Sequence, residues 1–392
     1  MSELNVDKNL RGQSSKEALK SVLELAKKLG YIKSVTLNYK IGKPGYSDKN
    51  QFKAPYMIEF GDETRWIIFA TTSIRDRVKE QYWEALNIKE IDPLIKAAYL
   101  VYPDSISEKE RNTAEAKNRK IQTNAEYATL EGIVSQDTIS NMIEAYALKN
   151  KSKGQKLDAK GNNFESRVAA TLSNSQNLQK WQSESDTIEG VHFEMFLKIL
   201  TCFNLDKKTV SKIDATCDKK IIGLLPSGGP AKTDVLVKVY SDKGIAYFSI
   251  SCKRSSLNSV SIHQYDADTF ADVLDANNEE LRALLNLFQE KGNRRDMGEE
   301  NSRRLTEVIR PYNKALSMWA LGGIGGAGDP KKQWANYILT YNNNDGSVSI
   351  HTLNEYYELL VSNGTSGMFG TLFGWTYQGK RGTNIQLKCK IL

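Results

Sequence analysis

The sequence has few of the side chains that cross-link small proteins or hold zinc. Its 392 residues include only four cysteines and three histidines. The cysteines show no paired CxxC spacing, which excludes a disulfide framework and a cysteine-based zinc site. The histidines are too far apart in the chain to suggest metal-ligand spacing. These residues are Cys202, Cys217, Cys252, Cys389, His192, His263 and His351.

Long apolar runs are also missing. No stretch approaches the length that a membrane span requires, and the N-terminus lacks the apolar core of a signal peptide. We therefore expect a cytoplasmic protein with no membrane partner. Hydrophobic residues make up 40% of the chain and charged residues 26%, which is typical of an ordinary globular protein. The net charge of +7 favours a polyanionic partner without proving one.

The length of the chain is sufficient for two domains. Residues 149–161 are polar with few apolar side chains, and we interpret them as a linker. The predicted domains are an N-terminal α/β domain over residues 1–150 and a second domain over residues 160–392. The order of predicted elements indicates an α/β (α+β) protein with a mixed central sheet flanked by helices.

Residues 232–254 are the part of the sequence from which function can be argued best. Two runs rich in Val, Ile, Tyr and Phe flank the polar turn 241–244, which ends in glycine, and this pattern predicts a β-hairpin. Asp234 starts the first strand and Lys253 ends the second, so the two side chains should meet at the open end of the hairpin. A carboxylate beside a lysine suits metal-assisted hydrolysis of a phosphodiester, with the carboxylate holding Mg²⁺. An ordinary ion pair on an exposed hairpin explains the pair equally well.

This pattern resembles the PD-(D/E)xK nuclease superfamily and, within it, the type II restriction endonucleases. The family has an Asp and, roughly ten to twenty residues later, an acidic residue, any residue and Lys. Asp234 and Lys253 match the first and last members, and Cys252 takes the free position. Ser251 stands where the second acidic residue belongs, which is a departure. The resemblance implies a nuclease core with an additional N-terminal domain.

The resemblance also implies the remaining members of a metal site. Asp234 and the main-chain carbonyl of Cys252 would bind Mg²⁺, and Ser251 would bring a hydroxyl without charge. In this family a helix before the metal-binding strands often carries an acidic residue. Glu165 lies in the first turn of the helix predicted over residues 162–172, where it could supply the missing charge. A Glu that only complements the dipole of its helix is the alternative.

Basic residues in four parts of the chain are candidates for DNA contacts, and those of the N-terminal domain favour a DNA-contacting or accessory role for it. Arginine suits bidentate contacts with guanine edges and phosphates, and we interpret the arginine-rich segment 294–310 as a loop-rich DNA-facing surface. A strand ending in small hydroxyl residues before a basic helix could hold a phosphate near residues 71–79, although solvated helix charges explain that segment equally well. The candidates are Arg254, Arg294, Arg295, Arg303, Arg304, Lys380, Arg381, Arg75, Arg77 and Lys79.

The function that these features favour is Mg²⁺-dependent cleavage of double-stranded DNA at a short specific sequence. The catalytic candidates are Asp234, Lys253, Ser251 and Glu165. Enzymes of this kind mostly act as homodimers, so that both strands of a palindromic site are cut. Two alternatives remain: a DNA-binding module whose nuclease site is degenerate, and a structure-specific repair nuclease that uses the same chemistry.

Overall fold

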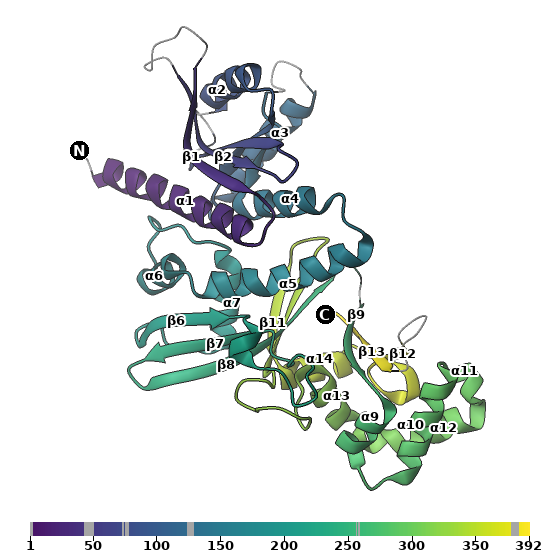
Figure 1. The fold of residues 1–392 in the computed structure, drawn as a ribbon. Coiled ribbons are helices and arrows are strands. Elements are labelled where there is room, and N and C mark those ends of the chain that lie inside the picture. The colour runs from purple at the N-terminus through teal and green to yellow at the C-terminus, as the bar shows by residue number, and fades with distance from the viewer. Residues whose placement is uncertain are drawn as a thin grey trace. The chain divides into compact units, whose positions relative to one another are not determined.

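The structure is a computed structural model of the full chain (Figure 1). It describes residues 3–42, 51–72, 74, 78–123, 129–255, 257, 259–377 and 384–392. The described chain divides into two compact units. The N-terminal unit contains residues 1–159 and 170–197, and the C-terminal unit contains residues 160–169 and 198–392. Among the described residues, no helix is long and apolar enough to cross a membrane.

The N-terminal unit is built on a five-stranded sheet in the order β1-β2-β3-β4-β5. The first three strands are antiparallel neighbours, and β3, β4 and β5 are parallel. The elements are α1 (Glu3–Lys28), β1 (Ser34–Ile41), β2 (Phe52–Glu59), β3 (Arg65–Ala70), α2 (Val78–Ile91), β4 (Ile95–Tyr102), α3 (Glu108–Thr123), β5 (Gly132–Ser135) and α4 (Gln136–Leu148). Strands β2 and β3 form an antiparallel hairpin.

Side-chain alternation along the strands gives this sheet two apolar faces. Ile67 and Phe69 pack on one face with residues of α2 and α3, whereas Trp66 and Ile68 pack on the other with residues of α1 and α4. Figure 1 shows the same arrangement, with the sheet between these two pairs of helices. Each fully buried side chain of this size stabilises the fold by about 1.5–3 kcal/mol, so burial on both faces holds the sheet.

The polar run that we interpreted as a linker is helical from residue 153. Helix α5 spans Lys153–Leu172, so the helix expected over residues 162–172 starts earlier than its apolar pattern indicates. The chain then continues into α6 (Ser175–Ser183) and α7 (Phe193–Cys202). Residues 170–197 belong to the N-terminal unit although they follow α5.

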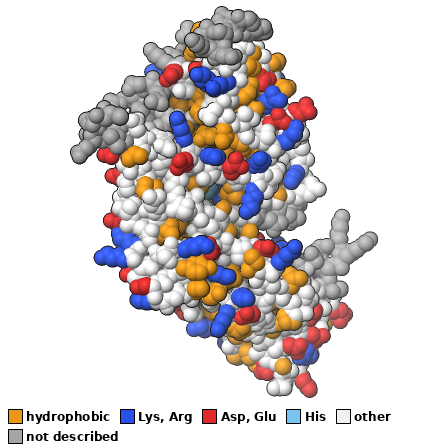
Figure 2. Space-filling view, turned by 60° about the vertical axis from the view of Figure 1, so that its left-hand side comes forward, with side chains coloured by type: hydrophobic (Ala, Val, Ile, Leu, Met, Phe, Trp, Pro, Cys, Tyr) orange, Lys and Arg blue, Asp and Glu red, His pale blue; other side chains and the backbone are white. Residues whose placement is uncertain are grey.

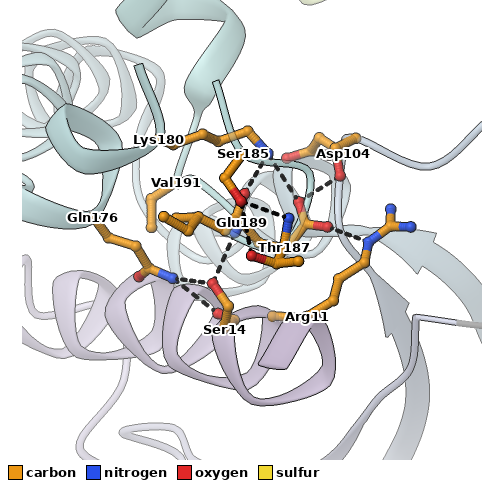
Figure 3. A network of polar contacts seen from close by, with 12 residues as sticks. Arg11, Ser14, Asp104, Gln176, Lys180, Ser185, Thr187, Glu189 and Val191 are labelled. Carbon is orange, nitrogen blue, oxygen red and sulfur yellow. Dashed lines mark hydrogen bonds and ion pairs between the residues drawn. The ribbon is translucent and has the colours of Figure 1, made fainter. Parts of the chain in front are cut away.

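A polar network attaches this returning segment to the N-terminal unit (Figure 3). The buried carboxylate of Glu189 accepts a hydrogen bond from Arg11 Nε at 2.8 Å and lies 3.4 Å from Lys180 Nζ. Ser14 Oγ accepts the backbone N–H of Glu189 at 2.7 Å and a hydrogen bond from Gln176 at 2.7 Å. Because the Glu189 side chain is only 2% exposed, the two cations that pair with it are what make its burial tolerable.

A second carboxylate of the N-terminal unit gives a testable dependence of stability on pH. Burial, and then the nearby charge of Asp137, raise the pKa of Asp104 to about 8. Asp137 also contacts the ring of His192. The folded chain therefore keeps a proton on Asp104 that the unfolded chain releases above about pH 4, so the free energy of unfolding should fall as pH rises from about 4 to about 8.

Asp104→Asn should remove this dependence because the amide cannot ionise. We expect the variant to be more stable than the wild type at pH 8 by on the order of 2 kcal/mol, and to differ much less at pH 4. Urea unfolding of both proteins at pH 4, 6 and 8 measures the difference. Parallel stability profiles for the two proteins would assign the pH dependence to other groups.

The C-terminal unit has a second five-stranded sheet, in the order β11-β10-β8-β7-β6, and a three-stranded sheet, in the order β12-β13-β9. The strands are β6 (Val210–Thr216), β7 (Val235–Ser241), β8 (Gly244–Ser255), β9 (Ser259–Tyr265), β10 (Tyr337–Asn342), β11 (Val348–Thr352), β12 (Gly374–Tyr377) and β13 (Ile385–Lys390). The helices are α8 (Lys219–Ile222), α9 (Ala267–Asp275), α10 (Glu279–Lys291), α11 (Arg294–Met297), α12 (Glu299–Ile309), η3 (Arg310–Tyr312), α13 (Asn313–Gly322), α14 (Leu353–Ser362) and η4 (Met368–Gly370).

The mixed sheet expected from the sequence is confirmed. Strands β6, β7 and β8 are antiparallel, and β10 runs parallel to β8 after a helical segment that includes α13. The predicted hairpin is β7–β8, in which Ser241 pairs with Gly244 across a two-residue turn. Its open end, formed by the start of β7 and the last residues of β8, is where the sequence places the candidate site.

Candidate active site

The open end of the β7–β8 hairpin brings the predicted carboxylate and amine together. Asp234 immediately precedes β7, and its backbone N–H donates to the carbonyl of Ile250 at 2.9 Å. This bond continues the pairing of Val235 with Ile250, so residue 234 lies opposite residue 251. Lys253 Nζ lies 3.4 Å from Asp234 Oδ2. The two side chains are 14% and 22% exposed, so solvent screens this pair less than a surface ion pair.

Three groups hold one oxygen of the Asp234 carboxylate. Oδ2 accepts hydrogen bonds from the backbone N–H of Cys252 at 2.7 Å, from Ser251 Oγ at 3.2 Å and from Lys253 Nζ at 3.4 Å. Within the described part of the chain, Oδ1 has no hydrogen-bond partner. The carboxylate is therefore fixed through one oxygen, and the other remains available to a ligand.

Ser251 occupies the position of the family's second acidic residue as a completely buried hydroxyl. Lys253 Nζ donates to Ser251 Oγ at 2.6 Å, and Ser251 Oγ in turn donates to Asp234. The Ser251 hydroxyl thus links the lysine to the carboxylate: it accepts a hydrogen bond from Lys253 and donates its own proton to Asp234. Lys253 Nζ also donates to the carbonyl of Cys252 at 3.2 Å, the main-chain oxygen that the resemblance assigns to the metal.

Glu165 on α5 faces the same site from the helix that precedes the strands. Burial, and then the charge of Asp234, raise the pKa of Glu165 to about 7, whereas Lys253 and Lys219 act in the opposite direction. Two carboxyl groups that disfavour each other's ionisation are the arrangement that a divalent cation relieves. The role of Glu165 in metal binding remains a prediction, and its electrostatic interaction with Asp234 is consistent with that role.

The donor set at this site consists of oxygen atoms. The carboxylates of Asp234 and Glu165 and the carbonyl of Cys252 are the hard ligands that Mg²⁺ prefers. The described residues contain no group of three or more His, Cys, Asp or Glu side chains placed to hold a metal ion. The site therefore fits a cation that keeps several water ligands, and it does not fit zinc.

Two lysines outside the predicted catalytic set also belong to the surroundings of the site. Burial, and then the charge of Lys253, lower the pKa of Lys232 to about 7, and its ammonium donates to the carbonyl of Ile262. Lys219, at the start of α8, is close enough to influence Glu165. In the sequence, Lys219 is part of a basic cluster that could contact phosphate, and Lys232 stands two residues before Asp234.

The arginine-rich segment is helical, so its interpretation as a loop-rich surface is wrong. Arg294 and Arg295 are exposed on α11, and Arg303 is exposed on α12. Arg304 binds Glu280 and also donates to Glu307 at 3.1 Å. The pair with Glu280 joins α12 to α10, and the pair with Glu307 lies within α12, so Arg304 has a structural role in the described chain.

The other predicted DNA contacts are only partly described. Arg254 donates to Asn343 Oδ1 at 2.5 Å, and its guanidinium lies 5.2 Å from the centre of the Tyr341 ring. Lys79 is in α2, although its side chain is outside the described set. Arg75, Arg77, Lys380 and Arg381 lie outside the described residues. Figure 2 shows basic and acidic side chains interspersed over the visible face, without one continuous basic field.

Sequence comparison finds related proteins that are described as restriction enzymes. Residues 139–389 match the family described as "Restriction endonuclease MspI". The chain is 28% identical over 404 residues to the type II restriction enzyme BsuFI of Bacillus subtilis, with 98% of this chain and 99% of that protein covered. It is 22% identical over 243 residues to the type II restriction enzyme MspI of Moraxella sp, with 60% of this chain and 91% of that protein covered.

A solved structure has a similar fold. The crystal structure of restriction endonuclease MspI in complex with its cognate DNA matches with a TM-score of 0.54 and 20% sequence identity. The match covers 64% of this chain and 98% of that one. The family match begins at residue 139, whereas the likeness to BsuFI extends over nearly the whole chain, including the N-terminal unit.

Proposed function

The chain belongs to the MspI family of restriction endonucleases, and on this premise we propose that Asp234, Lys253 and Glu165 carry out its DNA cleavage with Mg²⁺. Membership makes it a type II restriction endonuclease, a hydrolase that cuts DNA at a specific sequence. Enzymes of this type generally use a divalent metal ion. The observation that supports our assignment of the site is the 3.4 Å approach of Lys253 to Asp234 at the open end of β7–β8.

Asp234, Glu165 and the carbonyl of Cys252 would hold Mg²⁺. A bound Mg²⁺ supplies positive charge that stabilises the negative charge developing on the scissile phosphate. The hydrogen bonds that Asp234 accepts at Oδ2 orient its carboxylate before any ligand arrives. Such preorganisation reduces the reorganisation that the reaction would otherwise require.

Lys253 would place the attacking water and favour its deprotonation. Its ammonium is positioned by Ser251 Oγ at 2.6 Å and by the Cys252 carbonyl at 3.2 Å, and it can donate a hydrogen bond to a water oxygen. The water oxygen forms a new bond to phosphorus as the bond to the leaving oxygen breaks. The proton lost by the water passes to solvent because a charged lysine cannot accept it.

We also propose a homodimer. The described site contains one Asp234–Lys253 pair, which can cut one strand at a time. Two copies related by a two-fold axis would place one such pair at each strand of a palindromic sequence. Sedimentation of the protein with and without a duplex that it cuts would measure the number of chains bound.

Digestion of a sequenced plasmid with Mg²⁺, followed by mapping of the fragment ends, tests the function directly. We expect discrete bands whose ends share one short sequence, and no cleavage when EDTA replaces Mg²⁺. Nicking that follows DNA structure would favour a repair nuclease. Binding without cleavage would favour a DNA-binding module in which Ser251 marks a degenerate site.

Glu165→Gln should raise the Mg²⁺ concentration needed for half-maximal cleavage by roughly tenfold or more. The amide keeps the shape of the side chain but removes a negative charge from the metal-binding site. Cleavage rates measured over a Mg²⁺ titration would show the shift. Glu358→Gln on α14 is a matched control, since Glu358 is not part of the site. An unchanged titration would leave Glu165 as a partly buried carboxylate in the interior of α5 with no part in metal binding.

A further inference from the structure

The main sheets of the two units share the order and direction of their first four strands. In each sheet three antiparallel strands are followed by a fourth strand parallel to the third. The strands are β1, β2, β3 and β4 in one unit and β6, β7, β8 and β10 in the other. The C-terminal unit inserts α8 after its first strand, and β9 with several helices before its fourth. The fifth strands also differ, because β5 is parallel to its neighbour and β11 is antiparallel. The two sheets thus share a four-strand core.

The described N-terminal sheet lacks the carboxylates that the C-terminal sheet carries at the candidate active site. The open end of its β2–β3 hairpin is formed by the first residues of β2 and the last residues of β3, and the described strand residues there include no Asp or Glu. Lys53 lies near the start of β2, the end of the strand at which Asp234 precedes β7. Helix α1, which precedes the sheet, carries Lys16 and Lys20. Lysines therefore gather near the end of the N-terminal sheet that corresponds to the active-site end of the other sheet.

These lysines line one hollow in the surface of the N-terminal unit. The hollow has a volume of about 450 Å³ and lies between α1, β1 and β2. Lys16 and Lys20 are four residues apart on α1 and therefore share a face of the helix. Lys40 and Lys53 are directly paired across β1 and β2. Four exposed ammonium groups from three elements therefore surround a single hollow.

The local backbone explains why the surface is open here. Pro55 in β2 has no N–H to donate to the strand pairing, and it lies between Ala54 and Tyr56, which pair with Tyr39 and Leu37. Asn38, between those two partners on β1, has a left-handed φ of 51°. Asn38 and Pro55 both line the hollow. The strand pairing is thus interrupted at the point where the lysines gather.

The charge of the hollow is not neutralised within the described chain. None of its four lysine side chains has a hydrogen bond or an ion pair among the described residues. Two carboxylates lie nearby. Glu84 accepts the backbone N–H of Lys53 at 2.8 Å, and Glu17 contributes to the raised pKa of Tyr56. Four amines against two carboxylates leave the hollow positive.

We infer that the N-terminal unit is a non-catalytic copy of the nuclease core that binds the sugar-phosphate backbone of the duplex in this hollow. The inference rests on the proposed function, which supplies the duplex. Exposed lysines on flexible stems suit phosphate charge, but they do not provide the rigid planar geometry that reads bases. Binding through the hollow is therefore independent of sequence, and it adds affinity for the DNA that the C-terminal unit cuts.

Replacing all four lysines by glutamine tests the hollow. The variant is Lys16→Gln, Lys20→Gln, Lys40→Gln and Lys53→Gln in the full chain. Fluorescence anisotropy with a labelled 30-bp duplex in EDTA, where cleavage does not occur, gives the affinity over a range of salt concentrations. We expect affinity at about 0.1 M salt to fall tenfold or more, and the slope of log K against log salt to become shallower by about 3.6, since each of the four lost phosphate contacts removes about 0.9.

The matched control removes four exposed lysines of the same unit that do not line the hollow. These are Lys27→Gln, Lys28→Gln, Lys109→Gln and Lys120→Gln. The control has the same net charge as the test variant, and its slope should change by less than 1. Circular dichroism verifies that both variants are folded, and Lys53→Gln alone, expected to lower the slope by about 1, replaces the quadruple variant if that one unfolds. Equal affinity and equal slope in test and control would overturn the inference.

The two proposals fail separately in these experiments. If the wild-type chain cuts a plasmid into discrete fragments but the lysine variant binds duplex like its control, only the hollow is rejected. If the wild-type chain does not cut but the lysine variant loses affinity relative to its control, the catalytic assignment is rejected and the hollow is supported.

Discussion

Asp234→Asn should lower the rate of DNA cleavage by at least about 10³-fold and leave duplex binding within a few-fold of the wild type. The amide keeps the size of the side chain and still offers one oxygen to the backbone N–H of Cys252, which the carboxylate accepts at 2.7 Å. It loses the negative charge that holds a divalent cation, and 10³-fold corresponds to about 4 kcal/mol of lost transition-state stabilisation. Single-turnover cleavage of a plasmid gives the rate.

A matched control for this variant lies on the same hairpin. Asp242→Asn changes an exposed aspartate in the turn between β7 and β8, at the end opposite the site. It should cut DNA at the wild-type rate. Cleavage by Asp234→Asn at a rate close to that of the control would remove Asp234 from the reaction. Such a result would mean that cleavage occurs at a different site in the chain, and we do not expect the N-terminal unit to contain one.

Lys253→Met should reduce the cleavage rate by about 10²–10⁴-fold, the range associated with losing one group that assists proton transfer. Methionine keeps most of the length of the side chain and removes the ammonium that Ser251 Oγ and the Cys252 carbonyl position. Because the carboxylates of Asp234 and Glu165 remain, metal binding should persist or strengthen. The measurement combines single-turnover rates with a Mg²⁺ titration.

The matched control for Lys253→Met is Lys238→Met. Lys238 lies on β7, and its ammonium is 5.7 Å from the centre of the Tyr247 ring. Its cleavage rate and Mg²⁺ titration should match those of the wild type. If Lys253→Met kept its full rate, the lysine would be only the partner of a buried carboxylate. If Lys253→Met lost activity because it unfolds, circular dichroism would show the loss of structure. Lys253→Arg would then be measured in its place.

The hairpin and its pair of charges were predictable because both depend on local patterns. Alternating apolar residues and a short turn ending in Gly244 determine that β7 and β8 pair, and the pairing brings residues 234 and 253 to one end. Glu165 was proposed from the resemblance, and the charge of Asp234 acts on it in the structure. The departure at Ser251 was also visible, but its contacts with both partners were not.

Other predictions failed where long-range contacts decide the structure. The arginine-rich segment contains too few apolar residues to look helical alone, yet α12 packs against α10 and Arg304 pairs with Glu280. The polar residues 153–161 resemble a linker by composition, but they continue into the apolar pattern of α5. Helix propensity and polar composition are weak signals that tertiary packing readily overrides.

The sequence alone determined which residues can perform chemistry: a carboxylate and an amine on neighbouring strands, with a hydroxyl in place of an acid. The tertiary structure decided what surrounds them, because packing joins residues that are far apart in the chain. It brought Glu165 close enough for the charge of Asp234 to act on it, returned residues 170–197 to the N-terminal unit, and gathered four lysines around one hollow. Periodicity along the chain reports local structure, whereas burial and charge pairing depend on which segments meet in space.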